Sequence, residues 1–138
     1  DRFRIGFPDC LDNRRTYPWG HEDHDLIEFH KVMIRIHKES TAFKYGSLKY
    51  LIGDYNLIGY VRFFEDDHYI TLVNNNDYEV DREYSVWESG IPRECEMERV
   101  VQTDSEGFTT DIVKYPVEGG KLHIVLPKKS AVVLRYRL

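Results

Sequence analysis

The chain has 138 residues, which suits one domain or one small domain with an appendage. Hydrophobic residues make up 41% and charged residues 31%, a composition that allows a packed core and excludes a disordered chain. The net charge of −5 argues against nucleic acid and anionic membranes as partners, because both require a concentrated positive field. No run of 18 apolar residues and no signal-peptide pattern is present. With only Cys10 and Cys95 as cysteines, we expect no disulfide framework and a reducing, cytoplasmic location.

The first element that the pattern predicts is one long amphipathic helix at residues 23–39. Residues 1–21 show no period and contain several Gly and Pro residues, so they are expected to be irregular. Asp23 and Asp25 then place negative charge at a helix start, and Lys38 places a cation near its end. The apolar stripe of this helix is wide enough to expect neighbours on more than one side. It consists of Leu26, Phe29, Val32, Met33 and Ile36, widened by Ile27 and Ile34.

From Gly46 the hydrophobic period falls to two, which is typical of β-strands. Aromatic residues, at 14% of the chain, also favour half-buried sheet surfaces. The spacing predicts a mainly β domain, an antiparallel Greek-key β-sandwich of seven or eight strands that follows the single helix. The expected strands cover residues 47–52, 57–65, 69–75, 83–89, 95–102, 108–117, 121–127 and 130–138.

The stretch "DNRRTYPWGHEDHDLIEFHKVMIRIHKESTAFKYGSLKYL" at residues 12–51 resembles the end of the catalytic barrel in α-amylase family enzymes (glycoside hydrolase family 13). The likeness is nearest to the neopullulanase and cyclomaltodextrinase branch. The stretch "YVRFFEDDHYITLVNN" is similar to that family's strand pair ending in Asn, and "KLHIVLPKKSAVVLRY" is similar to its closing hairpin. The resemblance therefore extends over nearly the whole chain.

This resemblance implies two parts and a role in a longer protein. Residues 1–45 would be the remnant of a catalytic (β/α)₈ barrel, a loop plus the last helix, and residues 46–138 the C-terminal β-sandwich domain. A whole barrel needs about 250 residues and cannot fit here. The chain is then the non-catalytic C-terminal fragment of a glycosidase that acts on α-1,4 and α-1,6 glucans. Its sandwich would support the barrel, which is the expected partner and the only route to an α-glucan substrate.

No catalytic residue is expected in this chain. Glycoside hydrolysis needs two carboxyl groups that flank the bond, and in the family these acids follow earlier barrel strands whose motifs do not occur here. Glu94, Glu96 and Glu98 are expected to be the solvated face of an alternating strand. The chain alone is therefore predicted to be inactive and to carry no cofactor.

Three residues of the loop are candidate substrate contacts in the parent enzyme. The resemblance aligns Arg14 with an Arg that hydrogen-bonds a glucose unit, although Cys10 stands where the family has the partner Asp. A planar guanidinium suits paired sugar hydroxyls, and a surface salt bridge is the alternative. Arg15 is a weaker candidate of the same kind. Trp19 either lines the substrate cleft or packs the loop onto the helix start.

The six histidines do not predict a metal site. His21 and His24 lie three apart at the helix start, and a pair at such spacing can supply two ligands. No further Cys or His is placed to complete the set, so solvated, isolated histidines are expected. The remaining four are His30 and His37 in the helix, His68 in a turn and His123 in a strand.

Two other functions also fit the sequence. An independent carbohydrate-binding module would use surface aromatics; here Tyr84 and Trp87 are expected on opposite faces of one strand, with Tyr78 and Tyr115 near turns. A protein-interaction domain would use the helix as its contact surface. Self-association through Leu26, Phe29, Met33 and Ile36 would indicate this last function.

Overall fold

The structure is a computed structural model that describes residues 16–137. It divides into two compact units, Asp1–Ile34 and Arg35–Leu138, with the division inside helix α1 (His24–Glu39). The predicted helix at 23–39 is therefore confirmed. Asp23 lies just before it and its Oδ1 accepts a hydrogen bond from the Leu26 N–H at 3.2 Å, which satisfies one of the unpaired donors of the first turn.

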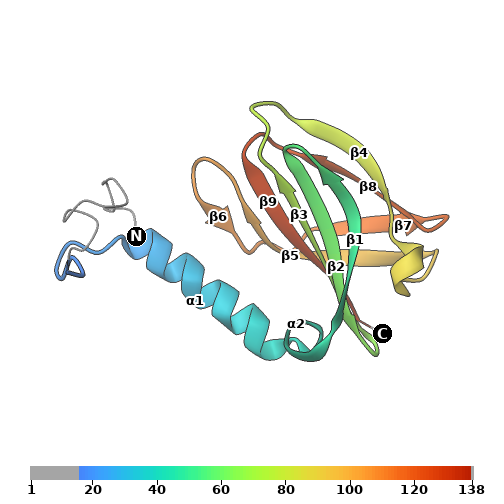
Figure 1. The fold of residues 1–138 in the computed structure, drawn as a ribbon, viewed down its shortest axis with the longest axis horizontal. Coiled ribbons are helices and arrows are strands. Elements are labelled where there is room, and N and C mark those ends of the chain that lie inside the picture. The colour runs from blue at the N-terminus through green and yellow to red at the C-terminus, as the bar shows by residue number, and fades with distance from the viewer. Residues whose placement is uncertain (1–15, 138) are drawn as a thin grey trace. The chain divides into compact units, whose positions relative to one another are not determined.

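The second unit contains the last turn of α1, a short helix and nine strands (Figure 1). The short helix α2 spans Thr41–Tyr45, and a 3₁₀ turn, η2, spans Trp87–Ser89. The strands are β1 (Ser47–Asp54), β2 (Leu57–Phe64), β3 (Asp67–Asn74), β4 (Val80–Ser85), β5 (Cys95–Thr103), β6 (Phe108–Thr109), β7 (Lys114–Glu118), β8 (Lys121–Leu126) and β9 (Ser130–Arg137).

All strand pairs are antiparallel, in the order β1-β2-β3-β9-β5-β7-β8-β4, with β6 added to β5. Strand β5 belongs to both layers: residues 98–103 pair with β9, while residues 95–98 pair with β7. It thereby joins the β1-β2-β3-β9 layer to the β7-β8-β4 layer (Figure 1). Non-consecutive neighbours such as β3 and β9 require crossing connections, and the predicted antiparallel sandwich is confirmed.

The core lies between the two layers and follows the period-two alternation of the strands. On β8, Leu122, Ile124 and Leu126 are buried while the residues between them are exposed. Strand β3 is buried on both faces, with Ile70 and Leu72 in the core. Further core residues come from the other strands and from the η2 region. They include Leu57, Val61, Tyr84, Val86, Ile91, Met97, Val117, Val132 and Leu134.

Two strand predictions differ from the structure. The single strand expected at 108–117 is split into β6 and β7, which accounts for nine strands in place of eight. The strand expected at 83–89 begins earlier, because Val80 pairs with Leu126 at the start of a six-residue ladder with β8. It also ends earlier, because residues 87–89 form η2 and Gly90 reverses the chain with φ 89°. Trp87 therefore does not share a strand with Tyr84, and the prediction that the two face opposite sides of one strand is wrong.

The β2–β3 turn lies one or two residues earlier than expected. Residues 66–68 were predicted to be the turn, but Glu65 and Asp66 make it, and Glu65 adopts φ 50°. Asp67 and His68 consequently open β3 and are both buried. The prediction of a solvated His68 is wrong, because this shift of the turn places its ring in the interior.

Helix α2 was not predicted, since five residues are too few to show a helical period. Its N-cap is Ser40, whose Oγ accepts a hydrogen bond from the Phe43 N–H at 3.0 Å. Its C-cap is Gly46, whose N–H bonds to the Ala42 carbonyl. A Cβ at Gly46 would lie 2.3 Å from that carbonyl oxygen and 2.6 Å from the Phe63 carbonyl oxygen of β2.

We therefore expect Gly46→Ala to destabilise the fold by about 2 kcal/mol or more, because two backbone segments would have to move apart. The matched control is Gly53→Ala in β1, where an added Cβ meets nothing within 4 Å. We expect that change to stay within about 0.5 kcal/mol. Urea unfolding of both variants measures the difference, and equal stabilities would contradict the close approach at Gly46.

Candidate functional site at the helix junction and the exposed faces

Of the three predicted substrate contacts, Arg14 and Arg15 lie outside the described residues. Trp19 lies in a turn: its N–H bonds to the Tyr17 carbonyl at 2.9 Å, and Gly20 follows with φ 80°. The indole is 79% exposed and meets the Tyr17 ring edge-on at 4.7 Å between centroids. The assignment of Trp19 as a sugar contact stays a prediction.

A buried carboxylate, that of Asp67, lies at the junction of α1 and α2 and is 3% exposed. Its Oδ2 accepts three hydrogen bonds from the segment that joins α1 to α2. The donors are the Ser40 hydroxyl at 3.0 Å, the Thr41 hydroxyl at 3.3 Å and the Ala42 N–H at 3.2 Å. Because an anion is favoured at a helix N-terminus, the carboxylate and the Ser40 cap together fix the start of α2.

The other carboxylate oxygen of Asp67 faces two cations of β9. The Nε atoms of Arg135 and Arg137 lie 3.8 and 3.9 Å from Oδ1, which is ion-pair distance without a direct hydrogen bond. Oδ1 and the Arg135 Nε are both buried and have no hydrogen-bond partner among residues 16–137. These ion pairs reduce the unfavourable free energy of burying the charge. Asp67 thus links the helix junction to the centre of the sheet.

Two further contacts hold α2 on the sheet. Arg62 of β2 donates from one guanidinium nitrogen to the carbonyls of Phe43 at 3.2 Å and Gly46 at 2.9 Å. The Phe43 ring packs against that of Tyr69 with centroids 4.7 Å apart. The pKa of Tyr69 is raised by this burial, which disfavours its charged form. The segment from Ser40 to Gly46 is therefore bound to β2 and β3 over its whole length.

The outer face of β1 and β2 is more apolar than a solvated sheet surface. On β2, Leu57, Gly59 and Val61 point inward, and the alternate positions point outward. The outward residues include exposed Ile58, and neighbouring β1 adds Leu48 and Tyr50, both exposed. β1 is also the edge strand among the strands that the structure describes, so its outer backbone groups have no ladder partner there. Such an edge is a place where another polypeptide surface can pack.

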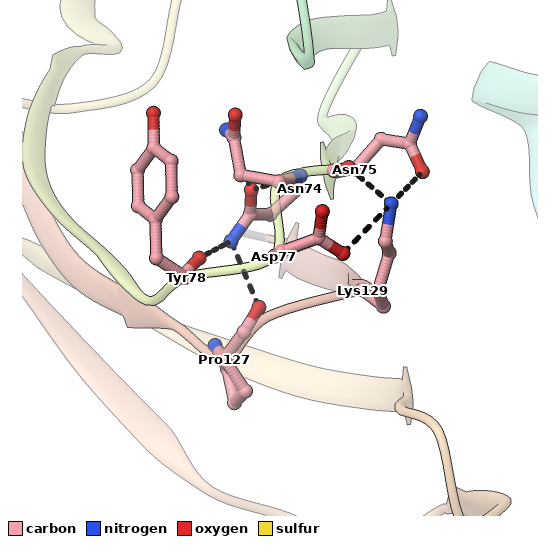
Figure 2. A network of polar contacts seen from close by, with 7 residues as sticks. Asn74, Asn75, Asp77, Tyr78, Pro127 and Lys129 are labelled. Atoms are coloured by element: carbon pink, nitrogen blue, oxygen red, sulfur yellow. Dashed lines mark hydrogen bonds and ion pairs between the residues drawn. The ribbon is translucent and has the colours of Figure 1, made fainter.

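A polar network fixes the loops at one end of the sandwich (Figure 2). Its centre is Asn74, the last residue of β3, which is 1% exposed. Its Nδ2 donates to the carbonyls of Tyr78 at 3.0 Å, Pro127 at 2.9 Å and Leu126 at 3.3 Å. Its Oδ1 accepts from the backbone and side chain of Asn76. One buried amide thus ties the β3–β4 loop to the β8–β9 turn.

Lys129 makes a second tie at the same end. Its Nζ donates to the Asn75 carbonyl at 2.8 Å and lies 3.4 Å from the Asp77 carboxylate, while its N–H bonds to the Asn76 carbonyl (Figure 2). Lys129 itself adopts φ 48°, a strained backbone conformation for a residue with a Cβ. The β1–β2 turn joins this end as well, because the Asn75 N–H bonds to the Asn56 carbonyl at 2.8 Å.

Trp87 is exposed, but its indole contacts two other segments of the protein. The guanidinium of Arg93 lies 4.4 Å from its ring centroid, a cation–π contact. Gly120 lies against the indole, since an added Cβ there would come within 2.7 Å of Trp87 Cδ1. The indole is thus in contact with protein atoms from two other segments.

The acidic residues of β5 behave as predicted. Glu94, Glu96 and Glu98 are all exposed; Glu96 and Glu98 lie on the solvated face of β5, and Glu94 directly precedes the strand. Glu96 pairs with Lys114 at 3.2 Å, and Glu94 accepts the Gly119 N–H. Beside them lies an open concavity of about 380 Å³ with mixed charge. Its lining residues are Glu96, Glu98, Lys114, Arg135, Tyr136 and Arg137.

Within residues 16–137, no group of three His, Cys, Asp or Glu side chains could hold a metal ion. His123 pairs with Asp81, and the buried His68 stacks on Phe63 and lies beside Tyr136. Cys95 carries a free thiol whose pKa is raised, chiefly by burial. In the part of the chain that the structure describes, no helix is both long and apolar enough to span a membrane.

Sequence reasoning missed Asp67 and Asn74. The resemblance pointed to an Asn at the end of a strand pair, but its role depends on carbonyls from distant turns. Asp67 was placed in a turn, where an acidic residue is ordinary. A Ser-Thr pair directly after a helix, at residues 40–41, was the one local sign of a further cap.

We expect Asp67→Ala to lower the free energy of unfolding by about 2–3 kcal/mol, since it removes three hydrogen bonds and leaves two cations without their anion. The control is Asp66→Ala, which changes the adjacent exposed acid of the turn and should leave stability within about 0.5 kcal/mol. Chemical denaturation of both variants measures this. A loss shared equally by the two would contradict the assignment.

The chain is similar in sequence or in fold to several known proteins. No family model matches the chain. Amylopullulanase of Thermoanaerobacter thermohydrosulfuricus is 35% identical over 77 residues, which covers 48% of this chain and 5% of that protein. The α-amylase of Geobacillus thermoleovorans superposes with a TM-score of 0.73 at 17% identity, over 92% of this chain and 26% of that one.

Two further structures agree. An Anoxybacillus α-amylase has a TM-score of 0.72 at 16% identity, over 91% of this chain and 25% of its own. The maltogenic α-amylase AmyB of Thermotoga neapolitana has a TM-score of 0.67 at 16% identity, over 94% and 29%. The chain therefore spans about a quarter of the length of these structures. The resemblance to α-amylase family enzymes that the sequence predicts is confirmed at the level of the fold.

Proposed function

We propose that this chain is the non-catalytic C-terminal portion of an α-glucan-hydrolysing glycosidase, in which the sandwich supports a catalytic barrel. The observation that supports the proposal comes from α1. This helix presents a wide apolar stripe, yet none of its residues is buried. The match of nearly the whole chain to about a quarter of each of several α-amylases supports a larger parent.

Helix α1 leaves apolar surface exposed whose burial would stabilise the protein. Leu26 and Ile34 are exposed, and Phe29, Val32, Met33 and Ile36 are only partly covered. Full burial of such a side chain contributes about 1.5–3 kcal/mol, so a stripe of this width is expected to have a packing partner. The last helix of a barrel would meet this requirement by packing on the barrel strands and neighbouring helices.

The segment that joins α1 to β1, residues 40–46, is a rigid attachment rather than a flexible linker. Asp67 and Arg62 hold residues 40–46 on β2 and β3, and the last turn of α1 belongs to the same compact unit as the sandwich. A flexible linker would instead be rich in Gly, Ser or Pro and unbonded. The exposed apolar residues Leu48, Tyr50 and Ile58 offer a second surface for the same partner.

The acidic residues support the absence of catalysis by this chain alone. Among residues 16–137, Asp67 is the one buried acid, and its carboxylate is bonded to the α2 start. A glycosidase needs two carboxyl groups facing a substrate cleft. The proposed partners are the barrel and, through it, an α-glucan; the free thiol of Cys95 fits the proposed cytoplasmic location.

Hydrogen exchange tests the supporting role. In the full-length protein, we expect the amides of residues 24–34 to exchange at least about tenfold more slowly than in the isolated chain, because packing against the barrel would oppose helix opening. The amides of the β3 core serve as the internal control and should exchange alike in both. Equal exchange of α1 in the two proteins would contradict the proposal.

Self-association of the isolated chain is the second candidate function that an observation favours. The exposed stripe predicts a concentration-dependent dimer in sedimentation equilibrium, since two copies can cover each other's helices. The double change Leu26→Gln/Ile34→Gln should weaken this dimer by about tenfold or more. Arg35→Gln, on the polar side of the same helix, is the control. A dimer unaffected by the double change would contradict an interface through α1.

A further inference from the structure

We propose that the junction between α1 and α2 is a helix-nucleating latch, formed by the contacts of Ser40 with Ile36, Phe43 and Asp67. The latch fixes the last turn of α1 on the sandwich, and the helix grows from that end toward His24. The sandwich thereby presents the apolar stripe of α1 as a preformed docking helix. That the partner is a catalytic barrel rests on the proposed function, whereas the direction of growth rests on the contacts of the junction alone.

The C-terminal end of α1 is joined to the sandwich through Ser40, which is fully buried. The Ser40 N–H bonds to the Ile36 carbonyl at 3.1 Å and so closes the last turn of α1. The Ser40 hydroxyl donates to the Asp67 carboxylate at 3.0 Å and accepts the Phe43 N–H at 3.0 Å. Ser40 therefore ends α1, begins α2 and is held by the first residue of β3.

An aromatic contact also holds the last turn of α1. The His37 ring stacks on the Phe43 ring with centroids 6.3 Å apart, and Phe43 in turn packs against Tyr69. Tyr69 is buried and belongs to β3, which pairs with β2 on one side and β9 on the other. The last turn of α1 is thus bound to the interior of the sheet by both polar and aromatic contacts.

The N-terminal part of α1 has weaker support. None of the residues of the helix is buried. The ion pair between Glu28 and Lys31 at 2.7 Å is exposed, and an exposed pair of this kind contributes little to stability. The Leu26 carbonyl bonds to the His30 ring at 2.7 Å, which is a contact within the same helix. The helix thus has one end anchored in the sandwich and one end held by local contacts.

The free energy needed to start a helix explains why the anchored end matters. Forming the first turn restricts several residues for a single hydrogen bond, and isolated helices below about 12–15 residues are marginal in water. Helix α1 has 16 residues, and its β-branched residues Ile27, Val32, Ile34 and Ile36 lower its helix propensity. The latch supplies a turn that is already formed, so each further residue toward His24 adds one hydrogen bond. A preformed helix also loses less conformational entropy when a partner covers it.

A symmetric pair of glycine substitutions in the 138-residue chain tests the direction of growth. Glu28 is the fifth residue of α1 and Arg35 is the fifth from its end, and both side chains are exposed. Glycine at either position weakens helix propagation there by about fivefold. In Arg35→Gly, we expect Cα chemical shifts to show loss of helix throughout residues 24–34, whereas Glu28→Gly should leave residues 30–39 helical. The spectra are recorded at a concentration where the chain is monomeric, because pairing of two copies would stabilise α1.

Ser40→Ala tests the latch itself, since it removes the hydroxyl that contacts both Asp67 and Phe43. We expect the ratio of helix to coil in residues 24–34 to fall by about fivefold. The matched control is Ser85→Ala, at an exposed position of β4, which should leave that ratio unchanged. The amide shifts of β3 and β9 report whether the sandwich stays folded in both variants.

Equal loss of helix in the two glycine variants would overturn the direction of growth, as would a helical population that is highest near His24. An unchanged α1 in a folded Ser40→Ala variant would overturn the latch. If Ser40→Ala unfolds the sandwich, the glycine pair decides the question. None of these outcomes bears on whether a barrel covers α1, which the hydrogen-exchange comparison of the two proteins tests separately.

Discussion

A buried carboxylate at the first residue of β3 fixes the start of α2 on the β-sandwich. Asp67 accepts three hydrogen bonds from residues 40–42 and lies at ion-pair distance from Arg135 and Arg137 of β9. A charge with 3% exposure is tolerated only when its surroundings replace the lost water. The chain therefore has one arrangement at this point that satisfies the acid, and α2 is ordered as a consequence.

The helix and most strands could be predicted from the sequence, because the apolar stripe of 26–36 and the alternation after Gly46 are long enough to show their periods. Short elements could not. Five residues of α2 and two of β6 carry no period, and the start of β4 at Val80 follows from its pairing with Leu126 rather than from local composition. The β2–β3 turn was misplaced because Asp66 and Asp67 are chemically identical, and only the tertiary environment decides which one is buried.

Part of the candidate site could likewise be predicted from the sequence, and part could not. The width of the apolar stripe on α1 predicts packing partners on more than one side of the helix, and none of its residues is buried in the described part of the chain. The role of Asn74 was not visible, because its amide bonds to carbonyls of residues 78, 126 and 127, two of which lie far away in the chain. Arg14 and Arg15 remain predictions from resemblance.

The close packing at Gly46 has a consequence for modular recombination. With two backbone carbonyls within 3 Å of where a Cβ would lie, position 46 leaves no room for a side chain. A crossover between related chains placed at residue 46 would separate the segment from Ser40 to Gly46 from the β2 and β3 atoms that it contacts. A crossover near residue 35 would transfer the sandwich with its own docking segment intact. The module that can be transferred therefore begins inside α1. A chimera should be joined within this helix, with the helical phase preserved, and not at residue 46.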